Sequence, residues 1–193
     1  MKEFQMDALL EEIASPSPDL GGGGVACIVG AMGISLNRMA LTLSKKEEKS
    51  LEKRQVRLLE LSSLDGLAYK KLLEAYRMDK GDPRRKMAIQ EASKEALSVP
   101  LEAYKLLEEV LLLQETYAKE VKKNVVSDVF SGHAMIQAAM ESLLYVIYLN
   151  GRKEDMDMGK HSQIRGEVKE KIEQVRDDIW LDFDHWKEGK SRC

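Results

Sequence analysis

One stretch limits what this chain can fold into more than any other: residues 15–44, which read SPSPDLGGGGVACIVGAMGISLNRMALTLS. Its two prolines stop any preceding helix, because proline cannot continue one. Gly21 to Gly24 then lead directly into small and apolar residues. Small side chains let another helix come close, although an interior glycine costs about 1 kcal/mol relative to alanine. The stretch therefore predicts a central helix from residue 23 or 24 to 43, with four small positions: Ala26, Gly30, Gly33 and Ala40.

The rest of the composition favours helix throughout. The chain has 193 residues with only four prolines, and runs of β-branched residues are nearly absent. Apolar residues recur at helical spacing in most segments. We expect an all-α, single-domain bundle over residues 1–193 with about six or seven helices: 2–14, 23 or 24–43, 47–78, 83–98, 101–122, 124–150 and 161–187. Pro100 is expected to break or kink the chain between two of them.

Charge and cysteine content exclude several classes of protein. Charged residues make up 33% of the chain, yet the net charge is only -3, so no basic excess indicates nucleic acid or an anionic membrane surface. The longest apolar stretch, 25–43, contains Asn37 and Arg38, which a membrane helix tolerates poorly. Cys27 and Cys193 make neither a disulfide framework nor a metal cluster. The acidic amino terminus does not read as a signal peptide, so we expect a soluble, cytoplasmic protein.

Two carboxylates stand in otherwise apolar helical rows. Asp65 interrupts a row that is small or apolar at every other position, and Asp128 interrupts a second row near the start of a later helix. A carboxylate in such a row is costly unless it is paired or functional. Asp65 is therefore either a functional group or the partner of a lysine or arginine on another helix. Asp128, with Asn124, is either functional or a helix cap.

The glycine run has two readings of its own. A glycine-rich helix start exposes free backbone N–H groups and allows a ligand to come close to the main chain. The alternative is a mobile loop between helices that has no binding role. No Gly-Lys-Ser/Thr follows the run, so it is not a Walker loop. His133, His161 and His185 lack metal-ligand spacing, so no metal site is expected.

Together these elements resemble the cyclodeaminase/cyclohydrolase family of tetrahydrofolate metabolism, whose opening motif is close to S-P-x-P-G-G-G-S. Residues 17–24, SPDLGGGG, occupy that motif, with Leu20 and Gly24 in place of its second proline and its serine. The order and spacing of the matches hold over about residues 4–150. The further matching segments are Leu41-Thr42-Leu43 before Lys45-Lys46, Asp65 to Tyr69, Val99 to Glu102, and Asn124 to Asp128.

The resemblance implies an all-helical, typically dimeric enzyme that acts on a folate at a cationic amidinium carbon. The reaction is then hydrolysis of methenyltetrahydrofolate to formyltetrahydrofolate, or closure of formiminotetrahydrofolate with loss of ammonia. A folate-binding or scaffold relative without turnover is the alternative of another class. No prosthetic group is expected. The basic cluster Arg84-Arg85-Lys86 is expected to be a solvated first turn of a helix, and its alternative role is to bind a polyglutamate tail of the substrate.

The resemblance also implies roles for individual residues. Asp65 or Asp128 transfers the proton, while Lys45 and Asn124 position the substrate. Tyr69 is expected in the core, with its hydroxyl available to the site. The glycines, Gly21, Gly22, Gly23 and Gly24, supply backbone contacts. The sequence does not decide which of the two aspartates is the base.

Overall fold

The computed structural model describes residues 6–16, 20–117, 120–151 and 170, and within these ranges it contains helices and no strand. The contacts within the chain divide it into two compact units, Met1–Lys153 and Glu154–Cys193. The helix expected at 161–187 lies outside the described residues apart from Glu170. The all-α prediction is confirmed by five helices and one short 3-10 turn: α1 (Met6–Ala14), α2 (Gly22–Leu43), α3 (Lys49–Arg77), α4 (Arg85–Tyr117), η1 (Lys123–Val125) and α5 (Val126–Gly151).

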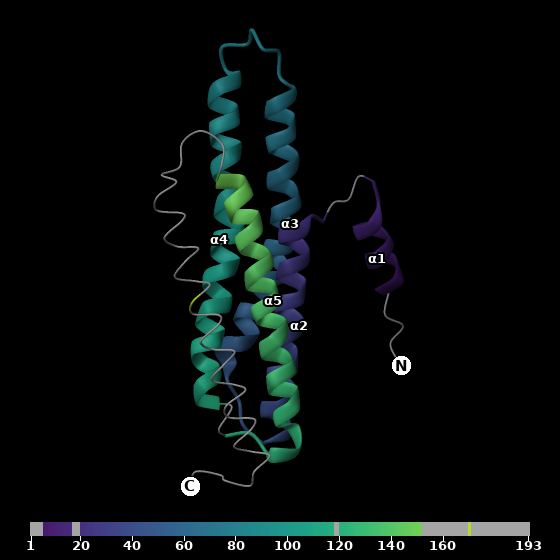
Figure 1. Cartoon of the computed structure of the whole chain (residues 1–193), viewed down its shortest axis with the longest axis vertical. Helices are drawn as coiled ribbons and strands as arrows, with labels where there is room; N and C mark the ends of the chain where they lie inside the picture. Colours follow the sequence, from purple (N-terminus) through teal and green to yellow (C-terminus); the bar gives the residue numbers. More distant parts are fainter. Residues whose placement is uncertain (1–5, 17–19, 118–119, 152–169, 171–193) are drawn as a thin grey trace. The chain divides into compact units, whose positions relative to one another are not determined.

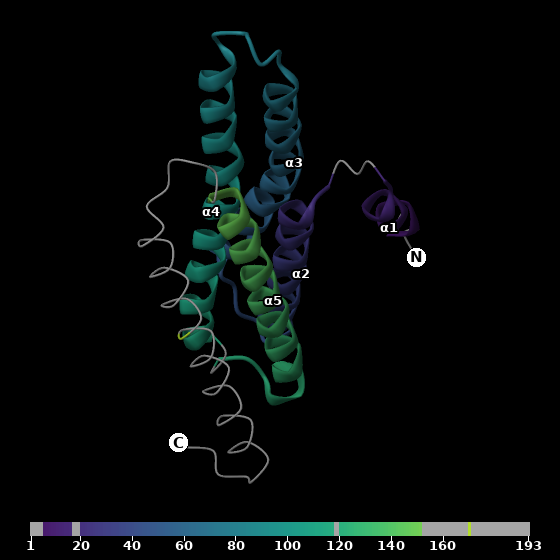
Figure 2. The ribbon, with the colours of Figure 1, turned by 45° about the horizontal axis from the view of Figure 1, so that its top comes forward.

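Four long helices, α2, α3, α4 and α5, form an up-and-down bundle in which α2 lies between α3 and α5 (Figures 1 and 2). α2 packs against α3, α4 and α5, while α4 also packs against α3 and α5. Neighbouring helices run antiparallel, as the ion pairs Arg57–Glu102 and Lys71–Glu95 show for α3 and α4. Of the helix predicted at the centre of the bundle, one face lies in the core, where Cys27, Ile34 and Ala40 are fully buried, while its opposite face is exposed at Met32 and Met39.

Glycine is the reason that α2 and α5 approach so closely. A Cβ at Gly33 would lie 2.6 Å from the carbonyl oxygen of Gly132, and a Cβ at Gly132 would lie 2.6 Å from that of Gly33. A Cβ at Gly30 would meet Leu107 of α4 at 2.8 Å. The predicted reason for the interior glycines of α2, close packing of another helix, is confirmed.

α2 is the one helix among the described residues that is long and apolar enough to cross a membrane. Of its most apolar window, 56% is buried inside the bundle. That degree of burial is typical of the core helix of a bundle.

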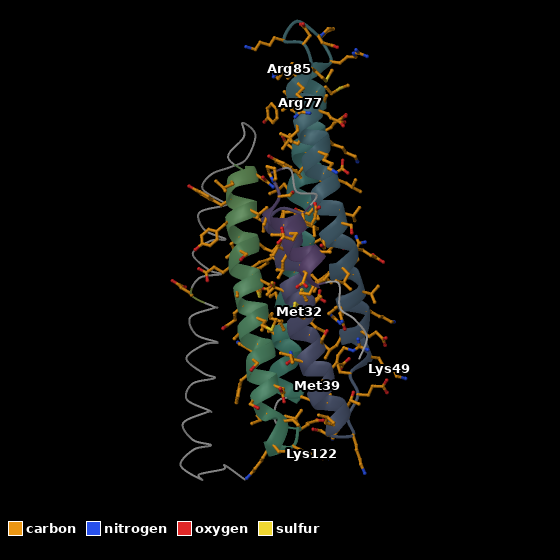
Figure 3. The ribbon with its side chains drawn as sticks, turned by 90° about the vertical axis from the view of Figure 1, so that its right-hand side faces the viewer. Met32, Met39, Lys49, Arg77, Arg85 and Lys122 are labelled. Atoms are coloured by element: carbon orange, nitrogen blue, oxygen red, sulfur yellow. The ribbon has the colours of Figure 1, made fainter. Side chains whose placement is uncertain are left out.

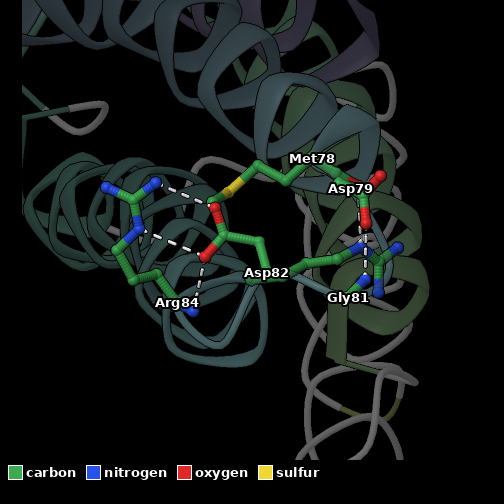
Figure 4. A network of polar contacts seen from close by, with 6 residues as sticks. Met78, Asp79, Gly81, Asp82 and Arg84 are labelled. Carbon is green, nitrogen blue, oxygen red and sulfur yellow. Dashed lines mark hydrogen bonds and ion pairs between the residues drawn. The ribbon is translucent and has the colours of Figure 1, made fainter.

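A compact turn joins α3 to α4 (Figure 4). The Asp82 carboxylate accepts hydrogen bonds from the backbone N–H of Arg84 at 2.8 Å and from its guanidinium. Asp79 accepts from the N–H of Gly81 at 2.7 Å. The Arg85 guanidinium donates to the carbonyl oxygen of Met78 at the end of α3. Since the last carbonyls of a helix have no partner within it, Arg85 supplies one.

The predicted break at Pro100 is wrong, because α4 continues through it. Proline has no N–H, so the carbonyl oxygen of Ala96, four residues earlier, loses its usual helical donor. The side-chain amide of Asn150 in α5 donates to that oxygen at 3.0 Å. A side chain 54 positions away thus replaces the missing hydrogen bond, and the helix continues.

Candidate functional site

The glycine run forms the first turn of α2 and meets Asp65 of α3. The N-cap residue is Gly21, which has no side chain that could accept a hydrogen bond from the first turn. Instead, the Asp65 carboxylate accepts a hydrogen bond from the N–H of Gly24, with 2.9 Å between N and Oδ2. The first N–H groups of a helix lack partners and form its positive end, so a carboxylate there is favoured.

The apolar row around Asp65 explains how the carboxylate reaches this point. Its other members are buried, as the sequence predicted, and they fix the face of α3 that points into the bundle: Leu51, Leu58, Leu61, Ala68, Leu72 and Ala75. Asp65 lies on that face at half-burial, where α2 begins. Among the described residues Asp65 takes part in no ion pair, so the alternative of a lysine or arginine partner finds no support there.

Burial controls the electrostatics of this end of α2. It raises the pKa of the Asp65 carboxyl, and the hydrogen bond from Gly24 acts in the opposite direction. Cys27, one turn further along α2, is fully buried. Burial, and after it the charge of Asp65, raises the pKa of the Cys27 thiol to about 12, so this thiol is neutral at physiological pH. Cys27 is thus a neutral neighbour of the carboxylate.

Tyr69 and α5 complete the surroundings of the α2 start. Tyr69 follows Asp65 by one helical turn, so both share a face of α3. The expected core position of Tyr69 is wrong: the residue is 57% exposed, because α2 starts at the level of Asp65 and does not cover it. From α5, Val146 approaches Gly22: a Cβ added at Gly22 would lie 3.8 Å from Cγ2 of Val146. The structure therefore brings together Gly21 to Gly24, Asp65 and Tyr69.

Gly24 shows why the motif serine is absent here. A Cβ at this position would lie 2.9 Å from the carbonyl oxygen of Ser62 and 3.1 Å from Cδ2 of Leu20. The backbones of α2 and α3 are therefore too close for a side chain at residue 24. Sequence reasoning missed Ser62 and Val146 as neighbours, since neither carries a motif; the departure at Gly24 was the one signal of this close contact.

Lys45, Asn124 and Asp128 gather at the other end of α2. Lys45 has φ of 58°, in the left-handed region, and the N–H of Lys46 donates to the carbonyl oxygen of Leu41 at 2.9 Å. Asn124 is exposed in η1, and Asp128 is half-buried in the first turn of α5. The Ser44 hydroxyl accepts from the N–H of Lys122 at 2.9 Å and ties the two segments together.

The length of α2 separates the two groups of residues. A helix of 22 residues is about 33 Å long. In Figure 3, Lys122 lies at the end of the bundle to which α2 runs, with Met39 and then Met32 further back along α2. A single chain therefore does not bring the expected site residues to one place.

No group of three or more metal-ligating side chains that could hold an ion occurs in the described part of the chain. His133 is buried in α5, and burial lowers its pKa to about 4, so it is neutral at physiological pH. His161 and His185 lie outside the described residues.

Comparison with known proteins gives the family. The model of the formiminotransferase-cyclodeaminase family matches residues 5–174. A methenyltetrahydrofolate cyclohydrolase of Methylorubrum extorquens is 33% identical over 164 residues, which cover 76% of this chain and 79% of that protein. The crystal structure of a formiminotetrahydrofolate cyclodeaminase from Thermotoga maritima superposes with a TM-score of 0.70 at 22% identity, over 97% of this chain and 96% of that one. The helical bundle, the glycine-capped α2 and these matches show that the chain belongs to the formiminotransferase-cyclodeaminase family.

Proposed function

We propose that this protein is a methenyltetrahydrofolate cyclohydrolase that opens the amidinium ring of its substrate to give formyltetrahydrofolate. The observation that carries the proposal is the Asp65 carboxylate, held at the start of α2 by the Gly24 N–H at 2.9 Å with no cationic partner among the described residues. The relative from Methylorubrum extorquens, at 33% identity, supports this choice of reaction.

The chemistry asks little of the protein beyond one base and correct placement. The carbon between the two nitrogens is already cationic, so water can add to it directly. Asp65 accepts a proton from the attacking water, and its charge faces the cation. As one C–N bond of the tetrahedral carbon breaks, Asp65 returns its proton to the departing nitrogen, the hydroxyl group on the carbon loses its proton to solvent, and the resulting formyl group stays on the other nitrogen. The N–H groups in the first turn of α2 are donors for the oxygen that gains charge.

Asp65 suits the role of base better than Asp128. Burial raises the pKa of the Asp65 carboxyl, which strengthens it as a proton acceptor. Asp128 lies in the first turn of α5, where an acidic residue stabilises the positive helix end. We assign Asp128 and Asn124 to substrate positioning together with Lys45.

Two copies of the chain can complete one site. An apolar stripe runs along the outward face of α2 and includes the side chains of Met32 and Met39, which are 42% and 41% exposed (Figure 3). Such a stripe on the central helix of a bundle favours association with an apolar surface. Its members are half-buried or exposed: Val25, Ile28, Met32, Leu36, Met39 and Leu43.

The position of the stripe sets the register of such a pair. If two copies pair through this stripe with their α2 helices antiparallel, a two-fold axis relates them. The axis then passes between the two helices at the level of Ile34, which is the midpoint of the stripe along the sequence. Lys45 and Gly23 lie at equal distances along the sequence from Ile34. The pair therefore places Lys45 of one copy level with Gly23 and Asp65 of the other. A homodimer thus brings together the two groups that a single chain keeps apart.

Cyclodeamination of formiminotetrahydrofolate is the second candidate, because the matching family model carries the name formiminotransferase-cyclodeaminase. The same amidine carbon reacts, but a nitrogen of the substrate attacks it and ammonia leaves. Asp65 would then move a proton to the departing ammonia.

An absorbance assay separates these outcomes. Purified protein is mixed with methenyltetrahydrofolate, and the near-ultraviolet absorbance of the methenyl compound should fall much faster than in buffer. Ammonia release from formiminotetrahydrofolate, without faster loss of the methenyl compound, would replace the first candidate by the second. Saturable folate binding without either reaction would contradict both and identify a binding protein.

A further inference from the structure

Gly23 lies directly against the Asp65 carboxylate. A Cβ at residue 23 would lie 2.5 Å from Oδ1, 2.7 Å from Cγ and 2.7 Å from Oδ2. Real Cβ atoms do not come that close to other heavy atoms. All three carboxylate atoms therefore occupy the space that any side chain at residue 23 needs.

Backbone conformation does not explain the glycine. Gly22, Gly23 and Gly24 lie within α2, and none has φ in the left-handed region. In an ordinary helical turn, alanine is better than glycine by up to about 1 kcal/mol. Residue 23 is therefore a glycine because it must lack a side chain: the Asp65 carboxylate occupies the space that a Cβ would take.

Resting on the proposed function, we infer that Gly23 is a positioning residue: its bare Cα lets the Asp65 carboxylate sit on the first turn of α2, with Oδ2 held by the Gly24 N–H and Oδ1 left for proton transfer. This role differs from a backbone contact to the substrate, which the motif alone had implied. A methyl group at residue 23 would push the carboxylate away from α2 while keeping its charge.

The groups around the carboxylate make its displacement measurable. The Cys27 thiol of α2, whose pKa is raised by burial and then by the charge of Asp65, is neutral at physiological pH. Tyr69 follows it on α3, and the α5 side chain at this end of α2 is the apolar Val146. Since burial is the main cause that raises the pKa of Asp65, moving the carboxylate outward should lower that pKa.

The first test measures stability and does not depend on the reaction. Gly23→Ala is compared with Gly22→Ala, whose Cβ would meet only Val146 at an ordinary 3.8 Å. Gly23→Ala should lower the melting temperature, and Gly22→Ala should leave it unchanged or raise it. In an Asp65→Ala background, Gly23→Ala should instead raise the melting temperature, because the carboxylate is gone and alanine favours the helix. An equal loss in both backgrounds would overturn the inference, and so would no loss in either.

The second test follows the carboxylate itself. In ¹³C NMR, the pH midpoint of the Asp65 carboxyl should fall in Gly23→Ala, because the carboxylate becomes less buried, and stay unchanged in Gly22→Ala. In the enzyme assay, Gly23→Ala should lower kcat about 100-fold with a nearly unchanged KM. A raised KM with unchanged kcat and an unchanged midpoint would show that the glycine contacts the substrate, contrary to the inference. If the protein has no folate activity, the melting and NMR results still decide the role of Gly23.

Discussion

At the scale of single residues, the buried charge of Asp65 lowers the stability of the folded protein but makes the carboxylate a better proton acceptor. The carboxylate is half-buried in an apolar row and receives one hydrogen bond from Gly24. Its folded-state pKa is raised, so the charged form costs stability in the folded state. The favourable contribution of the neutral carboxyl is complete below its ordinary pKa, about 3.9, and is lost as the pH rises through the folded-state value.

Asp65→Asn should therefore be at least as stable as the wild type at pH 7, and this advantage should disappear as the pH falls below 4. The amide oxygen can still accept from Gly24, but it cannot take a proton, so kcat should fall about 100-fold or more. Denaturant unfolding at both pH values and the absorbance assay measure these effects. Asp82→Asn is the opposite-sign control, because Arg84 lowers the pKa of Asp82 to about 2. A variant less stable than the wild type at pH 7 would show that Asp65 is structural.

Lys45, a residue of the proposed site, has a strained backbone conformation. It occupies the position after the α2 end where a left-handed glycine is usual, and its φ of 58° costs a non-glycine residue about 1 kcal/mol. The sequence could not reveal this, because Lys45 reads as an ordinary charged connector. A lysine retained there is consistent with a need for its ammonium group.

Lys45→Gly should therefore raise the free energy of unfolding by about 1 kcal/mol and lower activity. Lys45→Ala is the matched control, since it removes the ammonium but keeps the strain, and it should lose activity without gaining stability. Chemical denaturation and the absorbance assay give both quantities. Full activity in Lys45→Gly would remove Lys45 from the site.

At the scale of elements, helical periodicity predicted α2, α3 and α5 to within a few residues of their observed ends. It failed at Pro100, where local rules predict a break and the structure shows a continuous α4. The reason is not local: the Asn150 amide, on another helix, satisfies the carbonyl oxygen of Ala96. The sequence pattern of α4 alone cannot reveal that a side chain of α5 donates this hydrogen bond.

Asn150→Ala should cost about 1–2 kcal/mol of unfolding free energy, because it leaves the Ala96 carbonyl without its donor. In a Pro100→Ala background the cost should shrink, since the alanine N–H can donate to the same oxygen. A double-mutant cycle by denaturant unfolding measures this coupling. Additive effects of the two substitutions would contradict the exchange of one donor for another.

At the scale of the whole molecule, the motif residues were found from the sequence, but their arrangement was not. Gly24 and Asp65 meet across 41 positions because α2 and α3 are antiparallel. Lys45 and Asn124 meet neither, because α2 is about 33 Å long. A list of motif residues carries no distance along a helix, so it could not show that Lys45 and Asp65 lie at opposite ends of α2.

The proposed homodimer, in which Lys45 of one copy lies level with Asp65 of the other, makes a prediction about mixed dimers. Asp65→Asn and Lys45→Gly each damage both sites of a homodimer, but a hybrid of the two holds one site with native Asp65 and native Lys45. Random pairing makes half of the dimers hybrids, so a co-expressed mixture should regain about a quarter of wild-type activity. Hybrids isolated through two different tags should show about half, as one of their two sites is intact. Inactive hybrids of confirmed dimeric mass would mean that each chain builds its site alone, and the separation of Lys45 from Asp65 would then exclude Lys45 from it.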